Sequence, residues 1–244
     1  GENSVAIGYQ TTASGSSSVA MGSTTTASAN YSTAIGYKTT ASGKNSFAIG
    51  EETTASDFGS LTIGSYNSVN SVVTTGGNAN NYDNDNAAFV IGNGYEDYSD
   101  WMNPITVKSD AFVVYFNGNA TLSGDLTINS DERLKDNIQP LGSTLNKLHQ
   151  IEGKTYSLKK DEEHTPKIGV LAQEVQAVFP ELVTEGGDGI LSVNYQGLVP
   201  VLINAINEQD IKIAALEAQN AEIKEMVRLL ALKQSKTSSG VVAN

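Results

Sequence analysis

A pentapeptide that returns every 14 residues constrains this chain more than any other feature of its sequence. Each copy begins with Ser and ends with Gly, and the five copies are Ser4–Gly8, Ser18–Gly22, Ser32–Gly36, Ser46–Gly50 and Ser60–Gly64. A sixth copy, Ala88–Gly92, follows the fifth by two periods. A fixed period of this length indicates a solenoid, because one coil cannot bury its own apolar face whereas stacked coils can.

Each copy is interpreted as a short strand with apolar residues at alternate positions, followed by a turn closed by glycine. In the first copy, Val5 and Ile7 point to one side of the strand, whereas Ser4 and Ala6 point to the other. Two apolar side chains per coil make a thin core, so one chain alone would be marginally stable. Three chains around a common axis would bury both these residues and the row of Ala residues. We therefore expect a homotrimer.

Residues 1–64 resemble the head of trimeric autotransporter adhesins, whose repeats read like Ser-Val-Ala-Ile-Gly. The resemblance implies a left-handed parallel β-roll built by three chains. The alternative is a flexible linker rich in Gly, Ser and Thr, but such linkers do not keep a strict apolar period.

The charge of the chain argues against several classes of partner and cofactor. The net charge is −12, and residues 1–129 carry only 3 basic side chains against 11 acidic ones. Binding of nucleic-acid phosphate requires clustered Lys and Arg, so we expect no nucleic-acid partner. No stretch approaches the ~18 apolar residues of a membrane span, so we expect no membrane insertion. The absence of Cys excludes disulfides, and we expect no cofactor.

A change in composition near residue 130 marks a domain boundary. Residues 130–244 carry 12 basic and 16 acidic side chains, a mixture that is typical of an ordinary globular domain. The chain begins at Gly1 without Met, so we expect it to be the C-terminal part of a longer protein.

Residues 65–87 lose the period and become rich in Asn, Asp and Gly, which predicts an insertion that loops out of the solenoid. Asp83 and Asp85 alternate in this loop and could help to hold a calcium ion, although many loops with alternating carboxylates bind no metal. We therefore assign no metal ligand, and an ion held by residues 78–86 stays open.

Residues 95–101 place aromatic side chains beside carboxylates. Tyr95, Tyr98 and Trp101 are candidate receptor-binding residues, because aromatic rings can stack on sugar rings while carboxylates accept hydrogen bonds from sugar hydroxyls. The alternative is that these rings plug the end of the solenoid or lie in a trimer interface.

The apolar alternation returns over residues 105–128. Within this stretch, Asn117 and Gly118 separate two apolar runs, and this dipeptide is typical of a two-residue hairpin turn. We expect a short β region that leads into the domain boundary.

A second set of landmarks begins at Ser130. In chain order the landmarks are Ser130-Asp-Glu-Arg-Leu-Lys135, Ile168–Val175, Phe179–Val183 and Val193–Val199, ahead of a long helical stretch. They resemble the endosialidase-type intramolecular chaperone domain, which lies at the C-terminus of many phage tail spikes and fibres, and they cover nearly all of residues 130–233. The resemblance implies a trimerising chaperone that cuts itself off after assembly, with Ser130 and Lys135 as a Ser–Lys dyad.

The residues around Ser130 can support such chemistry. A serine hydroxyl is a weak nucleophile, and a lysine can act as its base when burial or a nearby cation lowers the lysine pKa. Arg133 is a candidate for that cation or a structural residue. Free backbone N–H groups at the start of the following helix could hold the charge on the attacked carbonyl.

We expect Ser130 to attack the carbonyl of Asn129, so that Ser130 becomes a new N-terminus. Which side of Ser130 is cut, and whether the dyad is completed within one chain, stays open. The alternative is that Ser130 merely caps a helix that contains Lys135.

A heptad pattern follows Pro200. One series is Ile206, Ile213, Asn220 and Val227, and a second series is Gln209, Leu216, Ile223 and Leu230. This spacing predicts a coiled coil that is compatible with a trimer but does not exclude a dimer. A generic amphipathic helix is the alternative. The tail after Lys233 is expected to be disordered.

Together these patterns predict a mainly β homotrimer, with a left-handed parallel β-roll or solenoid and then an α+β chaperone domain that ends in a long coiled-coil helix. The expected segments are the repeats in 1–64, an irregular insertion with the last repeat and a short β region in 65–129, the chaperone core in 130–200, and the helix with its tail in 201–244.

The predicted function is the tip of a trimeric phage tail fibre or spike in the virion. Its partners would be two further copies and a host surface glycan or protein receptor. It would be a serine endopeptidase only toward itself, and the chaperone would be released in the host cytoplasm.

Two other classes of protein are alternatives. A bacterial trimeric adhesin would bind matrix or glycan without proteolysis, and the chaperone-like C-terminal sequence disfavours it. A glycan-degrading spike could use Glu96, Asp97 or Asp100 as an acid/base pair, but a short solenoid leaves little room for a cleft.

Overall fold

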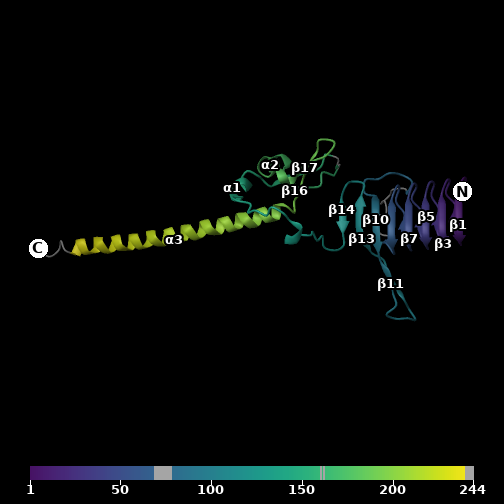
Figure 1. Cartoon of the computed structure of the whole chain (residues 1–244), viewed down its shortest axis with the longest axis horizontal. Helices are drawn as coiled ribbons and strands as arrows, with labels where there is room; N and C mark the ends of the chain where they lie inside the picture. Colours follow the sequence, from purple (N-terminus) through teal and green to yellow (C-terminus); the bar gives the residue numbers. More distant parts are fainter. Residues whose placement is uncertain (69–78, 160, 162, 240–244) are drawn as a thin grey trace. The chain divides into compact units, whose positions relative to one another are not determined.

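The computed structural model describes residues 1–68, 79–159, 161 and 163–239. The chain divides into two compact units, Gly1–Ser130 and Asp131–Asn244. The first unit is almost entirely β, and the second combines short strands with a long helix (Figure 1). The finer division into four segments stays a prediction.

The first unit is a parallel β-solenoid. Its main sheet begins with β1 (Val5–Tyr9), β3 (Val19–Ser23), β5 (Thr33–Tyr37), β7 (Phe47–Glu51) and β9 (Leu61–Ser65). Each strand pairs with the next at an offset of one period, so that Gly8 lies opposite Gly22 and Gly50 lies opposite Gly64. The predicted stacking of coils is confirmed.

Each of the first four coils contains a second strand that the sequence pattern did not predict. The strands β2 (Thr12–Ala13), β4 (Thr26–Ala27), β6 (Thr40–Ala41) and β8 (Thr54–Ala55) form a separate parallel sheet. A two-residue strand is too short to show alternation, so only the exact recurrence of Thr-Thr-Ala-Ser hinted at it. Each of these four coils is therefore a flattened loop with one longer and one shorter strand.

The core between the two sheets consists of small residues. Its Ala side chains come from both sheets and are at most 1% exposed: Ala20, Ala34 and Ala48 from the longer strands, and Ala27, Ala41 and Ala55 from the shorter ones. The expectation that the Ala row is buried by packing between chains is therefore wrong, because each chain buries it alone. Side chains this small let the two sheets approach closely but contribute little apolar area.

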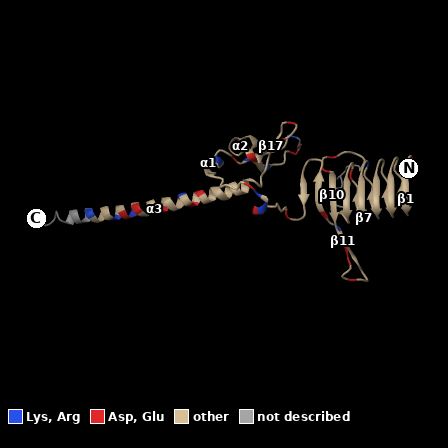
Figure 2. Ribbon diagram, in the orientation of Figure 1, with Lys and Arg blue, Asp and Glu red and all other residues tan. Residues whose placement is uncertain are grey.

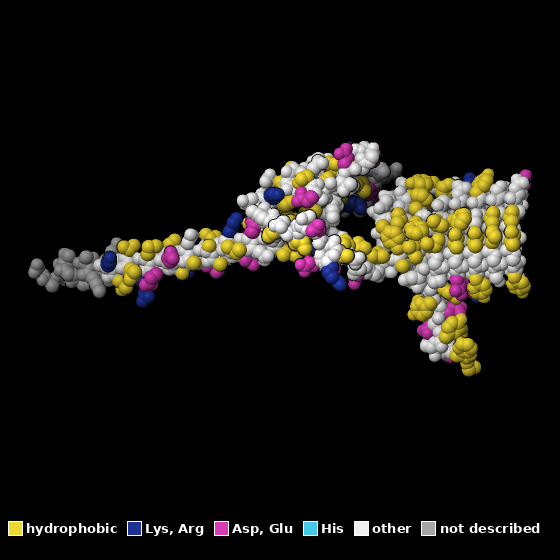
Figure 3. Space-filling model, in the orientation of Figure 1, with side chains coloured by type: hydrophobic (Ala, Val, Ile, Leu, Met, Phe, Trp, Pro, Cys, Tyr) yellow, Lys and Arg dark blue, Asp and Glu magenta, His cyan; other side chains and the backbone are white. Residues whose placement is uncertain are grey.

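The larger apolar side chains of the longer strands lie on the outside of the solenoid. They form columns along one face in Figure 3, and Val5, Ile7, Met21, Phe47, Ile49 and Leu61 are each at least 37% exposed. We call this set the apolar stripe. Monomeric soluble proteins seldom expose large contiguous apolar patches, so the stripe is an unusual surface for a single chain.

The repeated glycines do not close turns, contrary to the sequence reading. Gly8, Gly22, Gly36 and Gly50 lie inside the longer strands with φ between 126° and 134°, a range that favours glycine. A Cβ atom added at Gly22 would lie 2.0 Å from the carbonyl oxygen of Gly36 in the next coil. These glycines therefore allow the close approach of successive coils.

The sixth copy of the repeat closes the solenoid. Strand β10 (Ala87–Asn93) pairs in parallel with β9 and places Gly92 opposite Gly64, as the double period predicted. Its other edge pairs antiparallel with β13 (Asp110–Tyr115), which pairs with β14 (Ala120–Leu122). Gly118, with φ of 88°, sits in the turn between β13 and β14. The predicted hairpin is confirmed, but residues 116–119 connect its strands, so the turn is longer than the two residues predicted.

The side chain of Asn67 completes the backbone hydrogen bonds of the last short strand, just before the predicted insertion. In earlier coils, backbone groups of the shorter strands bond to the next coil, as when the Thr40 N–H donates to the Thr53 carbonyl. At the last short strand, the Asn67 side chain takes the place of that backbone. Its Oδ1 accepts from the Thr54 N–H at 2.6 Å and its Nδ2 donates to the Thr54 carbonyl at 3.1 Å. Residues 69–78 of the predicted insertion lie outside the described residues.

The second unit has a small α+β core. Its elements are η1 (Glu132–Leu134), α1 (Leu145–Leu148), β15 (Lys154–Tyr156), β16 (Lys167–Gly169), α2 (Ala172–Val178), η2 (Pro180–Leu182), β17 (Val183–Glu185), β18 (Leu191–Val193) and α3 (Leu198–Ser239). Val175, Val178, Phe179 and Val201 form the buried centre. Gly186–Gly189 make the predicted turn into a strand, because β17 and β18 form a hairpin across them.

Helix α3 is longer than the sequence indicated. It begins at Leu198, so Pro200 lies in its first turn, where a missing N–H is tolerated. It continues to Ser239, so the prediction of a disordered tail directly after Lys233 is wrong for residues 234–239. Between Pro200 and Ser239 the helix contains no Gly or Pro that would break it.

The predicted heptad seam is exposed on α3. Ile206, Ile213, Ile223 and Leu230 are each at least 50% exposed. Acidic and basic side chains are mixed along the helix (Figure 2). Among the helices that the structure describes, none has the length and apolar character needed to cross a membrane.

Candidate functional site

The segment that follows Ser130 is a short capped turn. Asp131 caps η1, and its Oδ1 accepts from the Arg133 N–H at 2.9 Å. Ser130 and Lys135 flank this turn, and both are exposed in the single chain. The interpretation of Ser130 as a helix cap is therefore wrong, because Asp131 fills that role.

Arg133 is used to fix this turn. Its Nη2 donates to Asp131 Oδ2 at 2.6 Å and its Nε donates to Asp131 Oδ1 at 3.0 Å. These bonds from Arg133 hold the pKa of the Asp131 carboxyl below its usual range. The charge of Arg133 is thus compensated within the turn, which favours the structural alternative for Arg133 over a role in lowering the pKa of a lysine.

The backbone N–H groups that were predicted to be free oxyanion donors after Ser130 are not arranged as expected. No long helix follows Ser130, because η1 spans only three residues. The N–H of Leu134 donates to the Asp131 carbonyl at 3.1 Å, and the N–H of Lys135 donates to the Glu132 carbonyl at 3.0 Å. With the Arg133 N–H bonded to Asp131, these three N–H groups already have acceptors.

A hydrogen-bond network that the sequence reading missed fastens the start of α1 to α3. Glu208 accepts from the Thr144 N–H at 2.6 Å and from the Ser143 hydroxyl at 2.8 Å. Asn204 Nδ2 donates to the Gly142 carbonyl at 2.6 Å. The network thus fixes residues 142–144 against α3. Its members are separated by about sixty residues in sequence, so no local pattern signals it.

The pH dependence of this network gives a testable prediction. The hydrogen bond from the Thr144 N–H, followed by that from the Ser143 hydroxyl, lowers the pKa of the Glu208 carboxyl below its usual range. The carboxylate therefore stabilises the unit above the unfolded pKa, and this contribution is lost as the pH falls through the folded pKa. Glu208→Gln should lower the melting temperature at neutral pH, and the difference from the parent should shrink below about pH 4.

Thermal unfolding, followed by circular dichroism on chains that all carry Ser130→Ala, would measure this effect. Glu217→Gln, at an exposed position of the same helix, is the matched control and should change little. A difference for Glu208→Gln that stays constant from neutral to acidic pH would contradict the role of the ionised carboxylate.

Two family models match this chain. Residues 1–66 match the YadA head domain repeat in four overlapping stretches, and residues 130–184 match the family described as chaperone of endosialidase. The first match covers the stacked coils, and the second begins at Ser130. The chain thus contains one segment that is similar to YadA head repeats and another that is similar to the chaperone of endosialidase.

Curated relatives of this chain are phage tail fibre proteins. It is 32% identical over 133 residues to the long tail fiber protein Gp37 of Salmonella phage S16, which covers 51% of this chain and 18% of that protein. It is 38% identical over 109 residues to Gp37 of Escherichia phage AR1, covering 41% of this chain and 9% of that protein. A probable tail fiber protein of Escherichia phage Phieco32 is 36% identical over 99 residues, or 38% of this chain and 14% of that protein. The chain spans less than a fifth of each of these relatives.

The three candidate receptor-binding residues lie on a hairpin that leaves the solenoid after β10. Strand β11 (Tyr95–Asp97) pairs antiparallel with β12 (Ile105–Val107), and the hairpin protrudes from the first unit (Figure 1). Tyr95 lies in β11, whereas Tyr98 and Trp101 lie in the connecting turn. Trp101 is 81% exposed, so the interpretation that it plugs the end of the solenoid is wrong for the single chain.

In the acidic loop before β10, the Asp carboxylates accept hydrogen bonds that stabilise the local turns. Asp83 Oδ1 accepts from the Asp85 N–H at 2.9 Å, and Asp85 Oδ1 accepts from Asn117 Nδ2 at 2.9 Å. Within the described residues, no group of three or more His, Cys, Asp or Glu side chains could hold a metal ion. These bonds give the alternating carboxylates a structural use in the loop.

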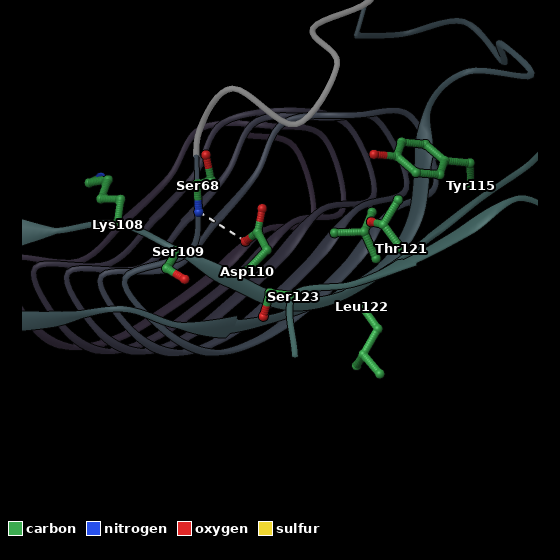
Figure 4. Close-up of a pocket in the computed structure, with 9 residues that line it drawn as sticks. Ser68, Lys108, Ser109, Asp110, Tyr115, Thr121, Leu122 and Ser123 are labelled. Atoms are coloured by element: carbon green, nitrogen blue, oxygen red, sulfur yellow. Dashed lines mark hydrogen bonds between the residues drawn. The ribbon is translucent and has the colours of Figure 1, made fainter. Parts of the chain in front are cut away.

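A polar groove of about 450 Å³ lies at the closing end of the solenoid (Figure 4). Asp110 lines it from the start of β13, and Lys108 lines it from the segment before that strand. Thr121 and Ser123 line it from the region of β14. Asp110 Oδ1 accepts from the Ser68 N–H at 2.9 Å, and partial burial raises the pKa of Asp110. No local pattern predicts this groove, because its residues meet only when β13 and β14 close the sheet.

Proposed function

We propose that this chain is a trimeric segment of a phage tail fibre that attaches to the host, and that its chaperone segment releases itself by a cut between Asn129 and Ser130. The tail fibre relatives and the two family matches support this assignment. The fibre would be part of the virion, and the chaperone would be released in the host cytoplasm during assembly. The proposed scissile bond, between Asn129 and Ser130, lies one residue before the boundary between the two compact units.

The exposed apolar stripe is the main observation that supports the proposed trimer. The interior of the solenoid is filled by Ala, Ser and Thr, so its larger apolar residues lack a core within one chain. Burial of these side chains between chains would stabilise the trimer by about 25 cal/mol for each Å² of apolar surface removed from water. The exposed heptad seam of α3 offers a second surface of the same kind.

A single charge in the stripe tests this interface. Ile49→Glu should prevent trimer formation, because a carboxylate would be buried between chains without a partner. Ser28→Glu, an exposed position at the corner of a coil, is the matched control and should leave the trimer intact. Light scattering after size-exclusion chromatography of chains that also carry Ser130→Ala would give the mass of each assembly. A trimer of undiminished stability in the Ile49→Glu chain would contradict the interface.

The cleavage chemistry requires one nucleophile and one base. Neutral Lys135 would take the proton of the Ser130 hydroxyl as Oγ bonds to the carbonyl carbon of Asn129. The bond from that carbon to the Ser130 nitrogen then breaks, and the proton moves to the departing amine. Water hydrolyses the resulting ester, which leaves a carboxylate on Asn129 and restores the hydroxyl of Ser130.

Assembly would activate this dyad. Ser130 and Lys135 are exposed in the single chain, whereas a lysine serves as a base when burial or a neighbouring cation lowers its pKa. Packing of three chains would supply that burial. Cleavage would therefore wait until the trimer has formed, and the monomeric Ile49→Glu chain with Ser130 retained should stay uncut.

A further inference from the structure

The hairpin made by β11 and β12 is fixed by its own hydrogen bonds. Asp97 Oδ1 accepts from the Ser99 N–H at 2.8 Å, and Asp100 Oδ1 accepts from the Met102 N–H at 3.0 Å. Asp100 Oδ2 also accepts from Asn103 Nδ2 at 3.1 Å. Tight local bonds of this kind fix the turn without a hydrophobic core. The turn residues are therefore held in one arrangement before any partner arrives.

Two aromatic rings are displayed on this turn. The centroids of Tyr98 and Trp101 lie 5.8 Å apart, and their planes are inclined by 39°. Tyr98 is 52% exposed and Trp101 is 81% exposed. The Tyr98 hydroxyl donates to Glu96, which holds the tyrosine ring in place. The rings thus form a fixed apolar platform, bordered by groups that accept hydrogen bonds.

We propose that Tyr98 and Trp101 are the stacking platform of a saccharide site that takes neutral or amine-bearing hexopyranose units. The apolar face of a sugar ring fits an aromatic ring, and the hydroxyls around it can donate to the neighbouring carboxylates. The site deepens the proposed attachment function and rests on it, because it names the chemical class that the fibre would contact.

The charge of the hairpin selects this class of sugar. Residues 94–107 contain Glu96, Asp97 and Asp100 but no Lys or Arg. The bonds that Asp100 accepts, first from the Asn103 side chain, lower its pKa, so this carboxylate is ionised at neutral pH. A phosphate-bearing or acidic polysaccharide would be repelled, whereas a neutral sugar would not and an amino sugar would be attracted.

A second copy of the chain is a less suitable occupant. The hairpin extends beyond the edge of the face that carries the apolar stripe, not over it (Figure 3). Three hairpins of the same negative charge would also repel one another if they met at an axis. The sugar class therefore accounts for both the exposed rings and the acidic rim.

The fluorescence of Trp101 provides a direct test, because it is the only tryptophan of the chain. The intact chain with Ser130→Ala would be titrated with maltoheptaose, with chitosan oligomers as the amine-bearing probe and with oligogalacturonate as the acidic probe. We expect saturable changes in emission with at least one of the first two, and none with oligogalacturonate. Tyr98→Ala keeps the reporter and should weaken binding about tenfold, the effect of losing about 1.4 kcal/mol of ring contact. Tyr9→Ala, an exposed tyrosine on the first coil, should leave the affinity unchanged.

Three outcomes would overturn the site. They are the absence of any saturable change with the neutral and amine-bearing probes, equal binding of oligogalacturonate, and an emission typical of a buried indole that becomes exposed when Ile49→Glu prevents assembly. The last would place the rings between copies of the chain. Because Ser130→Ala keeps every sample uncut, the sugar titration does not depend on self-cleavage. The mass of each assembly, measured in parallel, reports separately on the trimer.

Discussion

Replacing Ser130 with Ala should keep the chain at its full length of 244 residues, whereas the parent should divide into two fragments that meet at residue 130. The substitution removes the hydroxyl oxygen that attacks Asn129, and a methyl group cannot replace it as a nucleophile. The expected effect is complete loss of cleavage. Intact mass measurement of freshly purified protein would detect it, because either fragment differs from the whole chain by thousands of daltons.

Lys135 should be equally necessary. Lys135→Ala removes the base, and Lys135→Arg keeps the positive charge but cannot supply a neutral base, since the Arg side chain does not lose its proton in proteins. Both chains should therefore remain whole. Ser123→Ala and Lys159→Ala are the matched controls, and both should divide like the parent. Division of the Ser130→Ala chain at the same bond would rule out the serine as the nucleophile.

Gly22→Ala should destabilise the solenoid more than any single change at its surface. The added Cβ would lie 2.0 Å from the Gly36 carbonyl oxygen, and Gly22 has a φ of 126°, which Ala rarely adopts. The coils would have to move apart, at a cost of about 3 kcal/mol per chain. A trimer would carry the defect three times. Thermal and denaturant unfolding of the Ser130→Ala protein, with and without Gly22→Ala, would measure the loss.

Gly124→Ala is the matched control for this experiment. A Cβ at Gly124 would meet no heavy atom within 4 Å, so its stability should equal that of the parent. Equal stability of the Gly22→Ala protein would mean that successive coils are farther apart than the structure places them.

The repeat made the stacking of coils predictable. A strict period requires equivalent residues to lie in register, which is how Gly92 could be matched with Gly64 across an insertion. The orientation of the strand could not be derived in the same way, because alternation separates two faces without saying which one is inside. Ala20 and its equivalents face the interior, and the larger residues such as Ile49 face outward. The glycines were misread because a strand interior is an unusual place for them, and only the distance between coils explains their use.

The candidate site was predictable only in part. The order of the landmarks identified the chaperone segment and singled out Ser130 and Lys135 as a dyad, which stays a proposal. The roles of Asp131 and Arg133 in the turn depend on side-chain geometry that the motif does not encode. The contact of Glu208 with Thr144 depends on how α3 packs against α1, and sequence periodicity carries no information about such pairs. The exposure of Trp101 likewise depends on the hairpin formed by β11 and β12, and the sequence pattern did not predict that these strands pair.

The most direct test of a trimer that releases its own chaperone is native mass spectrometry of the parent protein after purification. It should show three copies of residues 1–129 as one assembly, separate from the fragment that begins at Ser130, while the Ser130→Ala protein should appear as three whole chains. A parent protein that appears as single, uncut chains under these conditions would contradict both the trimer and the cleavage.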